Sequence, residues 1–351
     1  MKWRYLRNFI RVLAWSACSV LAACSSPEAP VKQQFYSFGT IVEVSLWNVQ
    51  PAHAEEVLKQ LQEDMDYMHE TWHAWHNGPV SRLNSLLPHG KPFSVAPSVL
   101  PLIEQSKVLY QKSNGLFNPA IGGLITLWGF AQDEPPLGPP PTENEIKAFV
   151  DNLPTMDDLE IDGISIHSKN PRLQLNFGAY AKGYAVDMLM QRMREMGVTN
   201  GIINAGGDLR AIGSKGGKPW RIAIRHPQGQ GVLAFVEIQG DESVFTSGNY
   251  ERFFTYEDRR YHHILDPRTG YPAKGSTSVT VIHTNAAEAD AAATAIFVAG
   301  PGHWQATAAA MGMTQVMVVD EALAIEMTPA MARRVQFPAD PPPQVQIREP
   351  S

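Results

Sequence analysis

The chain has 351 residues, enough for one large domain or two smaller ones. Its hydrophobic content of 44% is typical of a protein with a buried core. Its formal net charge of −6 at pH 7 argues against binding to nucleic acid, and we expect no such partner.

The first 23 residues have the layout of a secretion signal. Four basic residues precede the apolar stretch 12–23, which ends in small residues directly before Cys24. This ending resembles the lipobox of bacterial lipoproteins, in which the cysteine is acylated and becomes the first mature residue. The alternatives are an ordinary signal peptide and a short membrane anchor. The resemblance implies a lipid anchor at Cys24 in the inner or outer membrane of a bacterial cell envelope, facing the periplasm.

The remaining composition agrees with an exported domain. Both cysteines, Cys18 and Cys24, lie in the export segment, so the sequence beyond it offers no disulfide and no thiolate metal site. Residues 24–34 read as a flexible tether. Loss of residues 1–23 removes four positive charges and no negative ones, so the net charge changes from −6 to −10. A polyanionic ligand would therefore need a cation beside it.

Beyond the tether, apolar periodicity predicts strands and helices without regular β-α-β alternation. This mixture predicts an α+β fold with mixed or antiparallel sheets and packed helices. We expect one domain over 35–336, with a proline-rich excursion at 132–141 and a proline-rich tail at 337–351. The predicted helices are 52–74, 98–113, 142–152, 180–196, 286–299 and 302–311, and the predicted strands are 35–47, 159–167, 172–177, 201–204, 220–225, 233–238, 277–283 and 315–319.

An alanine-rich helix carries the first candidate metal ligands. Asp290 and Thr294 are four residues apart, so on a helix both side chains point to the same side. A carboxylate and a hydroxyl suit Mg²⁺ or Ca²⁺, whereas zinc would favour histidine or cysteine. The simpler alternative is an aspartate that interacts with the helix dipole and a threonine packed in the core.

Two glycine turns are candidate ligand sites. Residues 176–182 (NFGAYAK) read as a strand, a turn and the start of a helix, which leaves backbone N–H groups free for a phosphate. Lys182 could reach a phosphate or an adenine edge, or it could be a surface lysine. Residues 204–208 (NAGGD) lack the dinucleotide-binding pattern GxGxxG, so we expect Asp208 to hold Arg210 or a neighbouring loop.

A further segment combines histidines with a turn. Residues 261–272 read YHHILDPRTGYP, in which DPRTG is a good turn sequence. Asp266 follows His263 by three residues and could orient it as a base. In isolation, a histidine at the end of a strand is more often structural.

The order of these motifs resembles the ApbE family of flavin transferases, once called thiamine-biosynthesis lipoproteins. The resemblance extends from about Phe35 to Ala332 and implies the ApbE-like α+β fold. Its elements are FGT (38–40), FNPAIG (117–122), LWGF (127–130), AKGYAVD (181–187), NAGGD (204–208), TSGNYERFF (246–254), HILDPRTGYP (263–272) and ADAAAT (289–294).

The resemblance implies an enzyme that binds FAD beside Mg²⁺, or alternatively Ca²⁺. It would transfer FMN through a phosphoester to a Ser or Thr hydroxyl of an acceptor protein and release AMP. The implied metal ligands are Asp290, Thr294 and the backbone carbonyl of Ala179. Some members have a second carboxylate at the position of Ala293, and its absence here implies more water or phosphate around the ion.

The implied FAD contacts are distributed over the whole domain. Phe38 stands where many members have methionine, and either side chain can cover a ring face. Trp75 replaces a frequent tyrosine. Asn118 and Asn176 replace frequent aspartates, which keeps hydrogen bonding but removes charge near a polyanion. The complete set is Phe38, Trp75, Leu116, Phe117, Asn118, Asn176, Lys182 and Ile264.

The resemblance makes His263 the catalytic base, with Asp266 either shaping the turn or orienting the imidazole. The acceptor would be a subunit of a membrane redox complex, such as a sodium-pumping or electron-transfer complex. Two alternatives remain open. One is a Mg²⁺-dependent FAD pyrophosphatase that uses water, and the other is a flavin-binding lipoprotein without catalysis.

Overall fold

The structure is a computed structural model that describes residues 29–229, 231–238, 240–339 and 341–350. The predicted signal segment and Cys24 lie outside the described residues. The chain divides into Met1–Pro30 and Val31–Ser351, and all the described helices and strands belong to the second unit. None of the described helices is both long enough and apolar enough to span a membrane.

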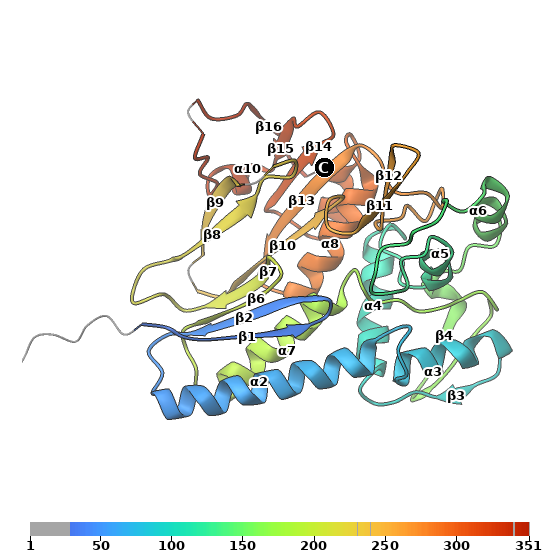
Figure 1. The fold of residues 1–351 in the computed structure, drawn as a ribbon, viewed down its shortest axis with the longest axis horizontal. Helices are drawn as coiled ribbons and strands as arrows, with labels where there is room; N and C mark the ends of the chain where they lie inside the picture. Colours follow the sequence, from blue (N-terminus) through green and yellow to red (C-terminus); the bar gives the residue numbers. More distant parts are fainter. Residues whose placement is uncertain (1–28, 230, 239, 340, 351) are drawn as a thin grey trace, which may run out of the picture. The chain divides into compact units, whose positions relative to one another are not determined.

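A nine-stranded sheet forms the centre of the second unit (Figure 1). Its order is β1-β2-β6-β7-β10-β13-β14-β15-β16, and all neighbours are antiparallel except β15 and β16. The strands are β1 (Val31–Ser37), β2 (Thr40–Leu46), β6 (Gly201–Ala205), β7 (Asp208–Ile212), β10 (Glu242–Gly248), β13 (Ser276–His283), β14 (Val316–Asp320), β15 (Ile325–Met327) and β16 (Val345–Ile347).

Three smaller sheets and nine α-helices complete the described fold. The small sheets are β8 (Trp220–Arg225) with β9 (Val232–Ile238), β11 (Phe253–Tyr256) with β12 (Arg259–His262), and β3 (Phe93–Ser94) with β5 (Ser165–Ser168) and β4 (Leu159–Asp162). The helices are α2 (Pro51–Trp72), α3 (Pro79–Leu86), α4 (Leu100–Lys112), α5 (Gly122–Leu127), α6 (Glu143–Val150), α7 (Ala181–Glu195), α8 (Ala286–Ala299), α9 (Trp304–Ala310) and α10 (Pro329–Ala332).

The central strands β13 and β14 of the large sheet are buried on both faces. Val281 and Val318 belong to the core shared with α2, α7 and α8, whereas their neighbours Ile282 and Met317 belong to the core under the β8–β9 hairpin. Successive residues of a strand point to opposite faces, so apolar residues at adjacent positions serve two cores. The continuous apolar runs of β13 and β14 follow from this burial.

Helix α8 is enclosed on nearly all sides, with 12 of its 14 residues buried. A helix that is apolar all round is expected inside a protein. Its N-terminus is capped by Asp187 of α7, whose carboxylate accepts the N–H groups of Ala286 and Ala287, both at 2.9 Å. The helices approach so closely that a Cβ on Gly183 would lie 2.3 Å from the carbonyl oxygen of Ala286.

The prediction of an α+β fold is confirmed, and α2, α4, α7 and α8 agree within two residues at each end with predicted helices. The predicted strand 35–47 is instead the β1–β2 hairpin. Phe38 and Gly39 form its turn with φ angles of 49° and 71°, which belong to a type I′ turn. Positive φ is uncommon for a bulky residue, so the pattern did not reveal the turn.

The predicted strand 172–177 is wrong in most of its length, because only one isolated bridge, Ile121 to Gln174, forms there. The segment bonds on one side to the irregular backbone at 119–122 and on the other side to a side chain. Asn84 donates to the carbonyl of Leu175 at 2.8 Å and accepts the Leu175 N–H at 2.7 Å. The backbone is thus satisfied without a sheet.

Other boundaries also differ from the prediction. The predicted strand 159–167 is the β4–β5 hairpin. Strand β1 begins at Val31, inside the predicted tether 24–34, and β16 lies inside the predicted tail 337–351. Pairing at the two edges of the sheet extends the folded unit beyond 35–336.

Replacement of Gly183 tests the close contact between α7 and α8. Gly183→Ala should reduce the free energy of unfolding by about 1–3 kcal/mol, because the new Cβ overlaps a buried backbone carbonyl. Urea denaturation measures this change. Gly138→Ala is the control, since a Cβ at Gly138 meets no atom within 4 Å. Equal transition midpoints for the two variants would contradict the packing argument.

Candidate functional site

The charged centre of the candidate site is an ion pair between Lys182, in the first turn of α7, and Asp208 at the start of β7. Asp208 is buried, and its second oxygen accepts the N–H of Thr246 at 2.9 Å. Burial alone would lower the pKa of Lys182, but the negative charges of Asp208 and Asp290 raise it above its ordinary value. Lys182 therefore remains charged.

Asp290 brings α8 to the same place. Its Oδ2 accepts the N–H of Gly183 at 2.9 Å, while Oδ1 receives no hydrogen bond from the described residues. Burial raises the pKa of Asp290 to about 7, although Lys182 acts in the opposite direction. A carboxylate in this position is stabilised by any further positive charge.

Two other predicted ligand oxygens come from α8 itself and from the segment just before α7. Thr294 is half-buried one turn further along α8, and its Oγ1 lies 3.1 Å from Oγ of Ser247 in β10. The carbonyl of Ala179 precedes Gly183 by four residues and accepts no hydrogen bond from the described residues. All three predicted metal ligands therefore belong to the region around the α7–α8 contact.

His263 is half-buried and is held by the backbone of Arg252. Its Nδ1 and its own N–H each lie 3.0 Å from the carbonyl oxygen of Arg252. A carbonyl only accepts, so Nδ1 carries the proton and Nε2 has the lone pair. Burial, together with the positive charges of Arg252 and Lys182, lowers the pKa of His263 to about 3. Lys182 thus acts electrostatically on both His263 and Asp290.

Asp266 is engaged in its own turn. Its carboxylate accepts from the backbone N–H of Arg268 at 2.9 Å and from the guanidinium of the same residue. Its backbone carbonyl accepts the N–H of Gly270 at 2.8 Å. Of the two roles expected for Asp266, these contacts correspond to shaping the turn.

The predicted FAD residues Phe38 and Phe117 are connected by a chain of aromatic contacts. The ring of Phe38 lies 6.2 Å from Trp72, which lies 5.4 Å from Tyr184 in α7. The contacts continue from Tyr184 to Tyr180 at 5.7 Å and from Tyr180 to Phe117 at 5.9 Å. Packing therefore brings the FGT, FNPAIG and AKGYAVD motifs together around the start of α7.

The remaining predicted FAD residues differ in their exposure. Trp75 has a buried indole N–H that finds no acceptor among the described residues. Asn176 accepts the N–H of Gly178 at 2.9 Å. Phe117 and Ile264 are almost fully buried, at 2% and 6% exposure, so any contact with a ligand requires their backbone or a small part of the side chain.

Two more residues complete the set of predicted FAD contacts. Asn118 is buried; its side chain donates to the carbonyl of Pro154 and accepts the N–H of Ala120. Leu116 is partly buried against the core.

Comparison with known proteins decides the family. A profile described as "ApbE family" matches residues 38–318. The chain belongs to the ApbE family. Its fold agrees with an ApbE protein of Thermotoga maritima, with a TM-score of 0.80 and 30% identity over 87% of this chain and 99% of that one. A flavin transferase ApbE from Vibrio cholerae has a TM-score of 0.76 at 25% identity, over 88% of this chain and all of the other.

Curated relatives have the same size or are larger. The FAD:protein FMN transferase of Rhodobacter capsulatus is 39% identical over 93% of this chain, which spans only 64% of that relative's length. A protein of the same name from Klebsiella pneumoniae is 29% identical over 90% of this chain and 93% of its own. The predicted ApbE-like fold is confirmed by these similarities.

Sequence reasoning missed the partners that position the ApbE site residues. Asp208 was expected to hold Arg210 or a neighbouring loop, but it holds Lys182 and a backbone N–H of β10. Arg210 instead pairs with Asp187 and Asp241. No local pattern signals these pairs, since each joins segments that are more than 20 residues apart.

One cavity has a volume of about 560 Å³. It is lined by His262, Arg260 and Lys274, among others, and by none of the predicted site residues. His262 precedes His263 in the chain, and its Nε2 lies 2.9 Å from the carbonyl of Ala273. The cavity is therefore not part of the candidate site.

His262 should make the protein sensitive to acid. Burial lowers the pKa of His262 to about 4, so between pH 4 and 6.5 the unfolded chain binds a proton that the folded chain does not. Stability is therefore lost as the pH falls through this window. His262→Gln should reduce the pH dependence of the unfolding free energy there by up to about 1.4 kcal/mol per pH unit.

Urea denaturation at several pH values between 4.5 and 6.5 measures this slope. His89→Gln, at an exposed histidine, should leave the slope unchanged. An unchanged slope in His262→Gln would show that folding does not lower the pKa of His262.

Proposed function

We propose that this protein is a metal-dependent FAD:protein FMN transferase. The observation that carries the proposal is the convergence of Lys182, Asp290 and His263, which are far apart in the sequence and linked electrostatically. Phosphoryl-type transfer needs positive charge at the phosphates, a positioned nucleophile and an acceptor for its proton. The curated relatives bear the name of this activity.

The oxygen atoms around Asp290 fit a hard divalent cation. A carboxylate, a hydroxyl and a free carbonyl are the ligand types that Mg²⁺ and Ca²⁺ prefer. Asp290, Thr294 and the carbonyl of Ala179 would hold the ion. When bound, it would neutralise charge on the diphosphate of FAD. Lys182 is the second positive group near this position, and its ion pair with Asp208 limits its freedom to move.

His263 would accept the proton of the acceptor hydroxyl at Nε2. The hydroxyl oxygen forms a bond to the phosphorus of the FMN half, the bond between this phosphorus and the bridging oxygen breaks, and AMP leaves with that oxygen. The carbonyl of Arg252 holds Nδ1–H and thereby keeps Nε2 free of its proton. The negative charge of bound FAD would raise the basicity of this imidazole, which burial alone keeps low.

The flavin ring would lie near Phe38 and Trp75. The buried N–H of Trp75 lacks an acceptor among the described residues, and a carbonyl oxygen of a bound ring would supply one. Phe38 keeps a positive φ, which is unfavourable by about 1–2 kcal/mol for a residue with a side chain. Strain of this kind is often retained at a binding site, where it aims a side chain at its ligand.

The acceptor and the location complete the proposal. The acceptor is a Ser- or Thr-containing segment of a membrane redox subunit, and the enzyme reaches it while anchored through Cys24 on the periplasmic side of the cell envelope. The acidic charge of the domain implies that its substrate contacts rely on local positive groups such as Lys182.

The decisive experiment incubates the protein with FAD, Mg²⁺ and an acceptor domain and measures the acceptor's mass. We expect covalent addition of FMN together with release of AMP. Release of AMP and free FMN without any addition would identify a pyrophosphatase. Bound FAD that remains intact would identify a carrier, and either result would overturn the proposal.

Replacement of the base should separate binding from chemistry. His263→Ala should bind FAD normally but transfer FMN about 10²–10⁴ times more slowly, because only the proton acceptor is lost. Equilibrium dialysis measures binding and the mass assay measures transfer. His89→Ala, at an exposed histidine, is the control for both. Full transfer by His263→Ala would exclude it as the base.

Removal of the metal ligand should have a larger effect. Asp290→Ala should lose transfer at every Mg²⁺ concentration, and chelation should abolish transfer by the unaltered protein. Rates measured across a Mg²⁺ titration test both statements. Glu288→Ala is a matched control, because it removes a carboxylate from the same helix that is paired with Lys112 and is not a predicted metal ligand. Activity that survives chelation would contradict the metal requirement.

Phe38 allows the ring contact to be tested without loss of the turn. Asn tolerates positive φ, so Phe38→Asn should fold at least as stably as the unaltered protein. The loss of an aromatic contact should weaken FAD binding by roughly 0.5–1.5 kcal/mol, or about 2- to 13-fold. Urea denaturation and FAD titration measure the two effects. Unchanged affinity would remove Phe38 from the flavin site.

A further inference from the structure

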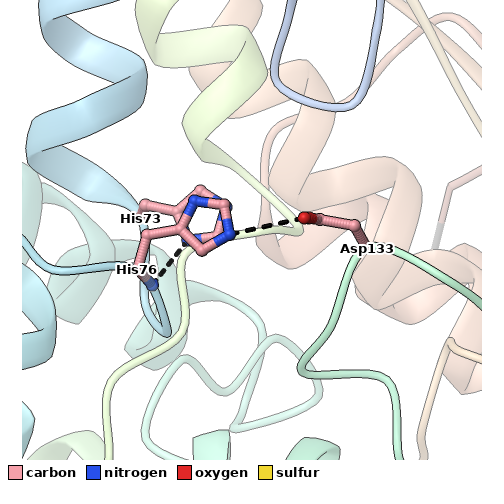
Figure 2. Close-up of side chains that lie close together, drawn as sticks. All are labelled: His73, His76 and Asp133. Atoms are coloured by element: carbon pink, nitrogen blue, oxygen red, sulfur yellow. Dashed lines mark hydrogen bonds and ion pairs between the residues drawn. The ribbon is translucent and has the colours of Figure 1, made fainter.

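The side chains of His73, His76 and Asp133, which come from two loops, converge on one another (Figure 2). His73 ends α2, and His76 lies three residues later in the connection to α3. Asp133 belongs to the proline-rich segment 132–141. One possible ligand atom from each residue lies within 4.8 Å of the other two. None of the three belongs to the expected FAD or magnesium residues.

The arrangement leaves ligand atoms available. The imidazoles of His73 and His76 are stacked, with centroids 3.7 Å apart and planes 2° from parallel. Nε2 of His76 lies 3.4 Å from Oδ2 of Asp133, as drawn in Figure 2. In a tetrahedral zinc site with bonds of about 2.1 Å, ligand atoms are about 3.4 Å apart. This pair therefore already has the separation that a shared ion requires.

The chemistry of the three groups differs from that of the oxygen set at Asp290. Two imidazoles and one carboxylate are a common ligand set for zinc and related transition metals, whereas Mg²⁺ and Ca²⁺ favour oxygen. His73 is half-buried and stacked against the imidazole of His76, while His76 and Asp133 are exposed.

Binding requires only a small local change. Nδ1 of His73 accepts the backbone N–H of His76 at 3.1 Å, so coordination through Nε2 needs the other tautomer and the loss of this hydrogen bond. The loss of one such hydrogen bond is small beside the free energy of a specific metal site. The side chains of His76 and Asp133 are 53% and 71% exposed and are free to adjust.

We propose that His73, His76 and Asp133 bind one divalent transition-metal ion of the zinc class, with water as the fourth ligand. This site is separate from the one at Asp290. It joins the loop that carries Trp75 to the segment that follows Phe130. A bound ion would fasten these two loops to each other.

The fastened segment is also tied to the catalytic side of the molecule. The guanidinium of Arg252 donates to the carbonyls of Phe130 and Gln132 at 3.1 and 2.7 Å, and the backbone of Arg252 holds His263. An ion at Asp133 would therefore restrain a segment in contact with the residue that orients His263.

The test measures Zn²⁺ binding by competition with a chromophoric chelator, on the purified chain and with saturating Mg²⁺ present. We expect one zinc site, weakened at least about tenfold in His73→Ala, His76→Ala and Asp133→Asn. His89→Ala and Asp290→Ala should bind zinc as the unaltered protein does. With Co²⁺ in place of zinc, visible absorption bands of a four-coordinate ion should appear and should be lost in His76→Ala.

The controls make each outcome decisive. Equal zinc affinity in the unaltered protein and in His76→Ala would overturn the proposal, as would zinc binding that is lost only in Asp290→Ala. Urea denaturation without metal should give the same midpoint for His76→Ala and Asp133→Asn as for the unaltered protein, because both side chains are mostly exposed. This zinc measurement needs neither FAD nor an acceptor, so its result is independent of the proposed transferase activity.

Discussion

The hydrogen bond from the Gly183 N–H to the Asp290 carboxylate is the contact on which the rest of the site depends. It requires a helix start without a side chain and a neighbouring helix made largely of alanine, since only then can the two backbones approach. The same contact brings Lys182 within electrostatic range of Asp290. The AKGYAVD and ADAAAT motifs are thus two halves of one packing arrangement.

Charge is distributed unevenly around this contact. Asp290 and Asp208 are both buried, and Lys182 is the positive group that they share. Burial raises the pKa of Asp290, and the negative charge of Asp208 adds to this effect while the single ammonium of Lys182 opposes it. A cation therefore suits this location electrostatically as well as by ligand type. His263, whose Nδ1 is held by a backbone carbonyl, adds an imidazole without adding charge.

The fold class and the long helices could be predicted from the sequence, because α2 and α8 have continuous patterns and clear ends. The Phe38 turn and the segment paired with Asn84 could not, since each depends on an unusual local conformation or on a distant side chain. The site residues were suggested by their motifs. Their partners were not, because the contact between Lys182 and Asp208 exists only after β7 has been placed in the sheet.

Helix α8 is enclosed by α7, by α9 and by strands of the large sheet, and most of its positions have no room for a larger side chain. Attempts to redirect the enzyme toward another dinucleotide are therefore best confined to the connections around it, above all the one after α2 and the proline-rich excursion. Those loops carry Trp75 and Asp133 and lie outside the tightly packed core. Substitutions in these loops can change the selectivity for the dinucleotide without altering the packing of α8, which carries Asp290.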